Sequence, residues 1–307
     1  MATYGNKNVP ALLFLIIMIS SGSMHKLCLN KSKKGPLALA IGIFDGVHLG
    51  HSDVIKELKK HDNNAIFTFN PHPRPNTKLV VPFSERISLL RKMGIGKAYA
   101  VDTEDHILGM SASEFIETVL IKTIKASDII VGEDFKLGKN RDTDAITFKK
   151  LCKEHGINVT IIKDLKIDGV KLSSTRIREL IIGADFNLIE KMLGRRYSIK
   201  GIVTSGKGFG AKLGFRTANI IPHREMAIPS SGVYSTITKF NGTEHKSVCF
   251  IGEGPKVVVE THIPGININL YGKKIEILFL RKMREVKRFK TAEELSKAIA
   301  EDIKNSV

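Results

Sequence analysis

The sequence predicts an α/β domain with a Rossmann-like parallel sheet, followed by a small antiparallel β-barrel with a C-terminal helix. Up to about residue 183, short apolar runs alternate with amphipathic segments, which is the pattern of strands joined by helices. After about residue 195, runs of β-branched residues are separated by Gly, Asn and Pro, which is typical of antiparallel strands and turns. With 307 residues, the chain is long enough for two domains.

The first half supplies the elements of a parallel sheet. The apolar run 37–44 indicates a buried strand, because parallel strands are covered on both faces. We expect further strands at 65–69, 98–101, 127–131 and 158–162, and helices at 52–60, 84–93, 112–124, 148–155 and 174–182. Ligands bind such sheets outside the carboxyl ends of the strands, so a site is expected there.

The second half supplies a barrel. Asn241-Gly242 separates two β-branched runs and predicts a tight hairpin turn. Thr291, with Glu294 three residues later, is a predicted N-cap for one helix that ends near Lys304. The barrel strands are expected at 199–204, 233–239, 246–251, 257–262 and 274–279.

Charge favours anionic partners. The chain has 48 Lys and Arg against 31 Asp and Glu, a formal net charge of +17. Nucleic acid, acidic lipid and nucleoside triphosphates all suit this charge, and a solvated basic surface is the simpler alternative. The charge is scattered, and there is no basic cluster interleaved with aromatic residues and no tryptophan, which argues against an RNA-binding enzyme. We expect no nucleic-acid partner.

Cysteines and the N-terminus bear on the compartment. The three cysteines, Cys28, Cys152 and Cys249, form no CxxC pair, which favours a reducing compartment and argues against a zinc site. The apolar run 9–19 is too short to cross a membrane, which takes about 20 residues in a helix. It is either a cleaved signal segment or a non-structural leader, and we favour a dispensable leader over residues 1–23.

The first chemical signature is the segment 42–51, GIFDGVHLGH. It follows a predicted strand, and His48 and His51 fall on one face where a helix begins. Two imidazole donors at the positive end of a helix suit a polyphosphate whose charge shifts during reaction. Gly50 lets the backbone approach such a ligand closely.

The second part of this signature is the segment 172–178, LSSTRIR, at the start of the next predicted helix. Ser174 and Thr175 offer hydroxyls, and Arg176 and Arg178 offer planar guanidinium groups that suit phosphate oxygens. Each piece alone has a plain explanation as a helix cap or a surface residue. The combination resembles the nucleotidylyltransferase superfamily, which transfers a nucleotide from a triphosphate and releases pyrophosphate.

A separate glycine-rich segment lies in the predicted barrel. A Rossmann loop must open a helix, and no helical pattern follows here, so a flap over phosphates is favoured over a plain hairpin. Thr217 and Asn219 lie two residues apart on one side of an extended segment and could face a magnesium nucleotide. Glu260, in the apolar run 257–260, is either a general base or an outward-facing strand residue. The glycines of the flap are Gly206, Gly208, Gly210 and Gly214.

Together these motifs resemble the bacterial bifunctional riboflavin kinase/FAD synthetase family. The resemblance covers residues 37–304 and rests on the ordered segments 42–51, 69–73, 131–138, 173–178, 193–197, 214–219, 232–234, 260–262 and 270–272. It implies that residues 24–185 form a domain that adenylylates FMN to FAD. It also implies that residues 186–307 form a domain that phosphorylates riboflavin to FMN. ATP would be the co-substrate and Mg²⁺ the cofactor of both reactions.

The resemblance also implies roles for individual residues. In the first domain, His48 and His51 would stabilise the triphosphate, with Arg178 assisting. In the second, Thr217 and Asn219 would bind Mg²⁺ and nucleotide, and Glu260 would deprotonate the ribityl hydroxyl. The remaining nucleotide- and substrate-binding residues would be Gly42, Phe44, Asp45, Gly46, Gly50, Asn70, Asp134, Lys171, Ser174, Thr175, Arg176, Gly206, Gly208, Gly210 and Gly214.

The second domain departs from the family pattern. Arg216 and Arg196 stand where the family usually has proline, and Pro255-Lys256 replaces a Pro-Thr pair with a longer loop. These departures predict that kinase turnover or Mg-ATP affinity is weaker than in the synthetase half. They also predict that Arg216→Pro leaves the kinase equal or improved. The alternative is an FAD synthetase whose silent kinase domain only binds flavin. The expected location is the cytoplasm, with no membrane partner.

Overall fold

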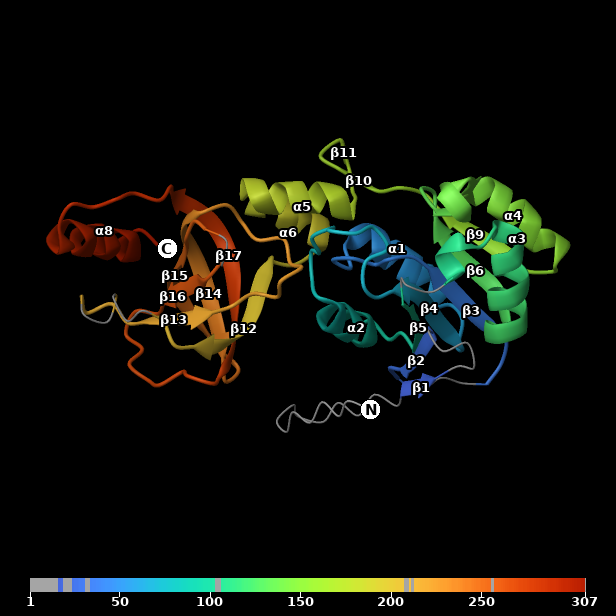
Figure 1. The fold of residues 1–307 in the computed structure, drawn as a ribbon, viewed down its shortest axis with the longest axis horizontal. Coiled ribbons are helices and arrows are strands. Elements are labelled where there is room, and N and C mark those ends of the chain that lie inside the picture. The colour runs from blue at the N-terminus through green and yellow to red at the C-terminus, as the bar shows by residue number, and fades with distance from the viewer. Residues whose placement is uncertain are drawn as a thin grey trace. The chain divides into compact units, whose positions relative to one another are not determined.

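The computed structural model describes residues 16–18, 24–30, 34–102, 106–206, 210, 213–254 and 257–306. Its contacts divide the chain into two compact units, shown in Figure 1. The first comprises residues up to 75 together with 83–164. The second comprises 76–82 together with 165 onwards.

The first unit contains a seven-stranded sheet in the order β1-β2-β5-β4-β3-β6-β9. The five strands from β5 to β9 in this order are parallel, and β1 and β2 add an antiparallel edge. The order reverses between β3 and β6, and sheets of this kind bind ligands outside the carboxyl ends of the strands at such a point. The strands are β1 (Ile16–Met18), β2 (Met24–Cys28), β3 (Leu37–Ile41), β4 (Asn64–Phe69), β5 (Lys97–Val101), β6 (Ala126–Gly132) and β9 (Asn158–Ile162).

Helices cover both faces of this sheet. On one face, α1 (Leu49–Leu58) and α2 (Phe83–Lys92) pack their apolar side chains against β3 and β4. On the other, α3 (Ala112–Phe115), its π-helical continuation Ile116–Ile124, and α4 (Ala145–Glu154) form a second core. Every residue of β3 is therefore buried, which explains its unbroken apolar sequence. Shorter elements are the 3₁₀ helices His106–Gly109 and Lys139–Arg141, and the strand pair β7 (Lys136–Leu137) and β8 (Thr143–Asp144).

The second unit is built on a closed antiparallel barrel in the order β12-β13-β16-β15-β14-β17. The turn between β14 and β15 is Asn241-Gly242, and both residues have positive φ, as the sequence predicts. The barrel strands are β12 (Ser198–Thr204), β13 (Thr217–Ile220), β14 (Gly232–Phe240), β15 (Thr243–Ile251), β16 (Val259–His262) and β17 (Lys274–Arg284).

Helices also pack on the barrel. In α6 (Phe186–Leu193), the Phe186 ring contacts the rings of Tyr197, Tyr234 and Phe279. In α8 (Ala292–Lys304), Asp302 accepts two hydrogen bonds from Arg284 at the end of β17. Thr291 caps α8 as predicted. The second unit also holds α5 (Ser174–Gly183) and the hairpin of β10 (Lys166–Ile167) and β11 (Val170–Lys171).

The predicted fold class is confirmed, with corrections at the edges. The expectation that the first strand begins at Leu37 is wrong, because β2 precedes it and pairs with β5. Ile16–Met18 pairs with β2, so the expectation that nothing before Met24 joins the sheet is wrong for these three residues. The rest of the expected leader lies outside the described residues. By contacts, 165–185 group with the barrel, and the functional boundary at residue 185 stays a prediction.

Candidate functional site

The first candidate site begins with two histidines that cap α1. His48 is the N-cap residue, and its Nδ1 accepts a hydrogen bond of 3.3 Å from the backbone N–H of His51. In return, Nδ1 of His51 accepts a bond of 3.3 Å from the backbone N–H of His48. The two rings stack with centroids 3.6 Å apart and planes tilted by 16°. This reciprocal arrangement fixes both rings at the start of the helix.

These bonds determine where the imidazole protons lie. An Nδ1 that accepts a backbone N–H carries no proton, so a neutral ring carries its proton on Nε2. The pKa of His51 lies well below its usual value, mainly because the ring is buried and also because His48 and Arg86 are nearby. His51 is therefore neutral at pH 7, with an Nε2–H donor. Together with the positive end of α1, this geometry suits an anionic ligand.

A buried arginine holds the loop that precedes these histidines. Arg86 in α2 is 2% exposed and donates hydrogen bonds of 2.6 Å to the Ile43 carbonyl and 2.7 Å to the Phe69 carbonyl. Burial lowers the pKa of Arg86 to about 10, and buried Asp45 opposes that shift. Arg86 thus links the loop after β3 to the end of β4.

The same loop contains the other predicted residues of the first segment. Phe44 is buried and has a φ of 56°, a conformation that is costly for a bulky residue and depends on the surrounding packing. Gly46 also has positive φ, Gly42 directly follows β3, and Gly50 lies in the first turn of α1.

Two further predicted residues of this unit follow neighbouring strands. Asn70 comes directly after β4 and is exposed, and Asp134 lies two residues after the end of β6 and is exposed. Since parallel strands end at one edge of the sheet, these residues share the edge with the histidine loop. The histidine loop, Asn70 and Asp134 therefore lie at the carboxyl ends of the strands of the first unit, and their role in ligand binding stays a prediction.

The predicted residues of the segment 171–178 belong to the second unit. Ser173, not Ser174, is the N-cap of α5, and its hydroxyl accepts from the N–H of Arg176. Arg178 donates to the Ser174 carbonyl, the Thr175 hydroxyl and the Lys78 carbonyl at 2.9–3.2 Å. Its guanidinium thereby joins α5 to the segment 76–82.

The other two cations of this segment are Arg176 and Lys171. Arg176 forms an ion pair of 2.9 Å with Glu179 on the same helix, and its Nε is buried without a partner among the described residues. Lys171 ends β11 and is exposed.

The third candidate group lies on β13 and β16 of the barrel. Asn219 pairs with Glu260 across the two strands, and Thr217 pairs with His262, so all four residues are on one face. The Thr217 hydroxyl lies 3.4 Å from Oε2 of Glu260, and the Asn219 amide nitrogen lies 3.5 Å from the Thr217 hydroxyl. The side-chain oxygens of Thr217, Asn219 and Glu260 are hard ligands of the kind that Mg²⁺ prefers.

Two glycines let the flap approach this group. A Cβ on Gly206 would lie 2.5 Å from the Asn219 amide nitrogen, and one on Gly210 would lie 2.5 Å from the Phe215 carbonyl. A side chain at Gly206 would therefore clash with Asn219 of β13, and one at Gly210 would clash with the backbone at Phe215. Gly214 lies in the turn before β13, and Gly208 falls outside the described residues.

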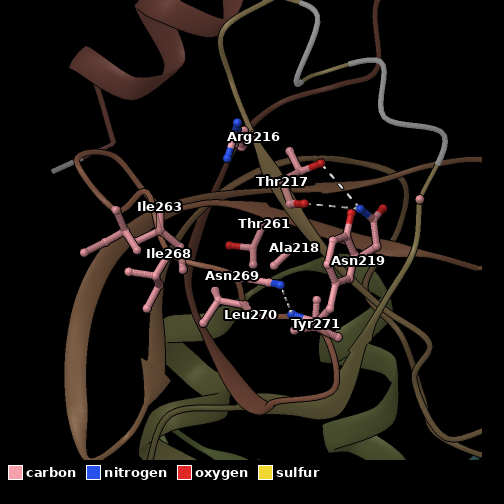
Figure 2. A pocket seen from close by; sticks show the side chains of 13 residues that line it. Arg216, Thr217, Ala218, Asn219, Thr261, Ile263, Ile268, Asn269, Leu270 and Tyr271 are labelled. Atoms are coloured by element: carbon pink, nitrogen blue, oxygen red, sulfur yellow. Dashed lines mark hydrogen bonds between the residues drawn. The ribbon is translucent and has the colours of Figure 1, made fainter.

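Of these residues, Gly206, Thr217 and Asn219 line a pocket of about 410 Å³ in the barrel unit, and Glu260 is not part of its lining. Figure 2 shows Thr217 and Asn219 together with Asn269, Leu270 and Tyr271, with Ile263 and Ile268 on the other side of the view. The pocket is lined by Val203, Gly206, Arg216, Thr217, Ala218, Asn219, Thr261, Ile263, Ile266, Ile268, Asn269, Leu270 and Tyr271.

Sequence reasoning missed two features of these sites. One is Arg86, although its position beside Ile87 and Leu90 on the apolar side of α2 was a usable signal. The other is the pocket wall formed by 263–271, an irregular segment without any periodic pattern. In the described part of the chain, no helix has the length and apolar character needed to cross a membrane.

Comparison with known proteins covers both units. Residues 30–176 match the family model for FAD synthetase, and residues 193–307 match that for riboflavin kinase. A relative from Buchnera aphidicola subsp. Schizaphis graminum, described as a bifunctional riboflavin kinase/FMN adenylyltransferase, is 30% identical. The alignment covers 87% of this chain and 91% of the relative. A relative of the same description from Bacillus subtilis (strain 168) is 29% identical over 92% of this chain and 95% of its own length.

A solved structure has a similar fold. The crystal structure described as a macrolide-efflux protein from Streptococcus pneumoniae matches with a TM-score of 0.78 and 24% identity. The match covers 91% of this chain and 97% of that one. At this identity the likeness concerns the fold alone.

The lowered pKa of His51 predicts a pH-dependent stability. The unfolded chain takes up a proton on this residue near pH 6.5, whereas the folded chain resists it. The free energy of unfolding should therefore fall as the pH drops below about 6.5. Urea unfolding between pH 5 and 8 should show this slope, and His51→Gln should reduce it. The exposed His155→Gln is the control, and an equal change in slope would contradict the prediction.

The buried position of Arg86 predicts a large stability effect. Arg86→Met removes the donor to two carbonyls and the cation beside buried Asp45, so the first unit should lose about 3 kcal/mol. Urea unfolding followed by circular dichroism would measure this loss. Arg91→Met, an exposed arginine of the same helix, should change stability by less than about 0.5 kcal/mol. Similar losses in both variants would mean that Arg86 has no special role.

Proposed function

The chain belongs to the bifunctional riboflavin kinase/FMN adenylyltransferase family, and we propose a division of these two activities between its sites. The chain phosphorylates riboflavin to FMN and adenylylates FMN to FAD, with ATP as the co-substrate of both reactions. The histidine loop serves adenylylation, and the Thr217–Glu260 group serves phosphorylation. The observation that carries this division is that the stacked histidine pair lies in the first unit and the Thr217–Glu260 group lies in the second, on separate elements.

In adenylylation, a phosphate oxygen of FMN attacks the α-phosphorus of ATP. The bond from that phosphorus to the bridging oxygen breaks, and pyrophosphate leaves. The nucleophile is already ionised, so no general base is needed. His48 and His51 donate Nε2–H bonds to the triphosphate as charge moves toward the leaving group. Because both rings are fixed by the backbone of α1, these donors need little reorganisation.

The other residues of this domain bind and orient the substrates in our proposal. Gly42, Phe44, Asp45, Gly46 and Gly50 shape the loop beneath the phosphates, and Asn70 and Asp134 lie at the same sheet edge, near adenosine or flavin. The segment from 171 to 178 contributes to ATP binding through Lys171, Ser174, Thr175, Arg176 and Arg178. This assignment extends the adenylyltransferase domain to residue 185.

In phosphorylation, Glu260 accepts the proton of the ribityl 5′-hydroxyl. The oxygen of that hydroxyl attacks the γ-phosphorus of ATP, and ADP leaves. Thr217 and Asn219 would hold Mg²⁺, which screens the charge of the phosphates. Gly206, Gly208, Gly210 and Gly214 form the flap over the phosphates. The contact of 3.4 Å between Thr217 and Glu260 supports an active kinase over a silent flavin-binding domain.

The partners and compartment follow from this chemistry. Riboflavin, FMN, FAD and ATP are the substrates and products, and no nucleic acid or membrane takes part. A cytoplasmic location suits these metabolites and the three free cysteines.

Removal of one histidine separates the two activities. His51→Ala deletes one oriented donor, so the rate of FAD formation from FMN should fall by about 10²–10³. Formation of FMN from riboflavin should continue at the original rate. Chromatography of riboflavin, FMN and FAD after incubation with Mg-ATP measures both. Loss of both activities in a folded variant would refute independent sites.

Substitution of Glu260, the proposed general base, should affect phosphorylation and spare adenylylation. Glu260→Gln keeps the size of the side chain but accepts no proton, so riboflavin phosphorylation should fall by about 10²–10⁴ while adenylylation of FMN is retained. Glu253→Gln, an exposed carboxylate near the same strand pair, is the control. An unchanged kinase rate in Glu260→Gln would make this residue structural.

A further inference from the structure

Arg216 lines the barrel pocket. It immediately precedes Thr217, the first residue of β13, and it lines the same cavity as Thr217 and Asn219. Of the described lining residues, Arg216 is the one with a charged side chain. In Figure 2 its side chain lies at the edge of the pocket next to Thr217. A cation thus stands beside the oxygens that face the nucleotide.

The arginine is held at this edge from two sides. Its Nη1 donates a bond of 3.0 Å to Oδ1 of Asn267, in the segment that forms the opposite wall. Its backbone carbonyl lies 2.8 Å from Nδ1 of His262, which must carry the proton because a carbonyl only accepts. His262 pairs with Thr217 on the neighbouring strand. The backbone before Thr217 is therefore fixed by a hydrogen bond, where a proline ring would fix it covalently.

The guanidinium retains capacity for a ligand. An arginine has five N–H donors, and the described residues engage one of them, through Asn267. No acidic side chain belongs to the described lining of the pocket, and the nearby Glu260 accepts from Thr217. A planar cation next to a hydroxyl and an amide matches the oxygens of a phosphate group.

We propose that Arg216 binds a phosphate group in the barrel pocket during riboflavin phosphorylation. This inference rests on the proposed function of the pocket. The phosphate is either the one that FMN carries after transfer or a phosphate of the adenine nucleotide. In both cases the arginine is part of the phosphate site. Arg216→Pro should then weaken phosphorylation, contrary to the expectation from the sequence alone.

The test compares charged and neutral ligands in the same kinase assay. The full chain carries His51→Ala throughout, so that FMN is not consumed by adenylylation. Initial rates of riboflavin phosphorylation give the KM of riboflavin, which has no phosphate, and the inhibition constants of FMN and of Mg-ADP. These three values are measured with Arg216 and with Arg216→Gln.

Loss of a charge-assisted hydrogen bond should weaken phosphate binding about tenfold to a hundredfold. With Arg216→Gln, the inhibition constant of FMN, of ADP, or of both should rise by this factor, while the KM of riboflavin changes less than about twofold. A rise for FMN alone identifies the flavin phosphate, and a rise for ADP alone identifies the nucleotide. Arg216→Lys, which keeps the charge, should recover part of the affinity.

Controls separate phosphate binding from a general effect. Arg196→Gln removes a positive charge from the same unit, but Arg196 pairs with Glu190 and does not line the pocket, so all three values should stay constant. Unchanged inhibition constants in Arg216→Gln would overturn the proposal, as would an equal rise in the KM of riboflavin. Failure of the chain with Arg216 intact to phosphorylate riboflavin would instead refute the kinase assignment.

Discussion

The guanidinium of Arg86 is the constraint on which the proposed adenylyltransferase site depends. It lies inside the α/β unit and ties the loop after β3 to the end of β4 through two carbonyls. A buried cation is costly unless it is well paired, and the hydrogen bonds and buried Asp45 offset that cost. These bonds hold the loop in place, with Phe44 in a strained backbone geometry. His48, which caps α1, and His51, in the first turn of α1, directly follow this loop.

The histidine pair shows how local backbone bonds set the chemistry of a side chain. Each ring uses Nδ1 to accept from the other residue's N–H, which leaves Nε2–H as the donor toward a ligand. Stacking at 3.6 Å disfavours a charge on both rings, and burial keeps His51 neutral. In the proposed function, the site would therefore stabilise phosphate through oriented dipoles and a helix end, in addition to any fixed positive charge.

In the kinase domain, the register of the strands brings the proposed site residues together. The pairing of β13 with β16 puts Thr217, Asn219 and Glu260 on one face, although more than 40 residues separate Glu260 from the other two in the chain. Arg216 lacks the fixed φ of a proline, yet His262 and Asn267 hold its backbone and side chain. His262 and Asn267 lie far from Arg216 in the sequence, and the fold of the barrel brings them next to it.

The sequence by itself determined the alternation of strands and helices, the Asn241-Gly242 turn, the Thr291 cap and the pairing of His48 with His51, because each depends on residues a few positions apart. It also determined the family, through the order of its motifs. Only the tertiary structure decided that Met24–Cys28 is an edge strand, that Arg86 is buried, and that residues 263–271 wall the pocket. Those features depend on contacts between distant segments, and hydrophobic periodicity carries no information about such contacts.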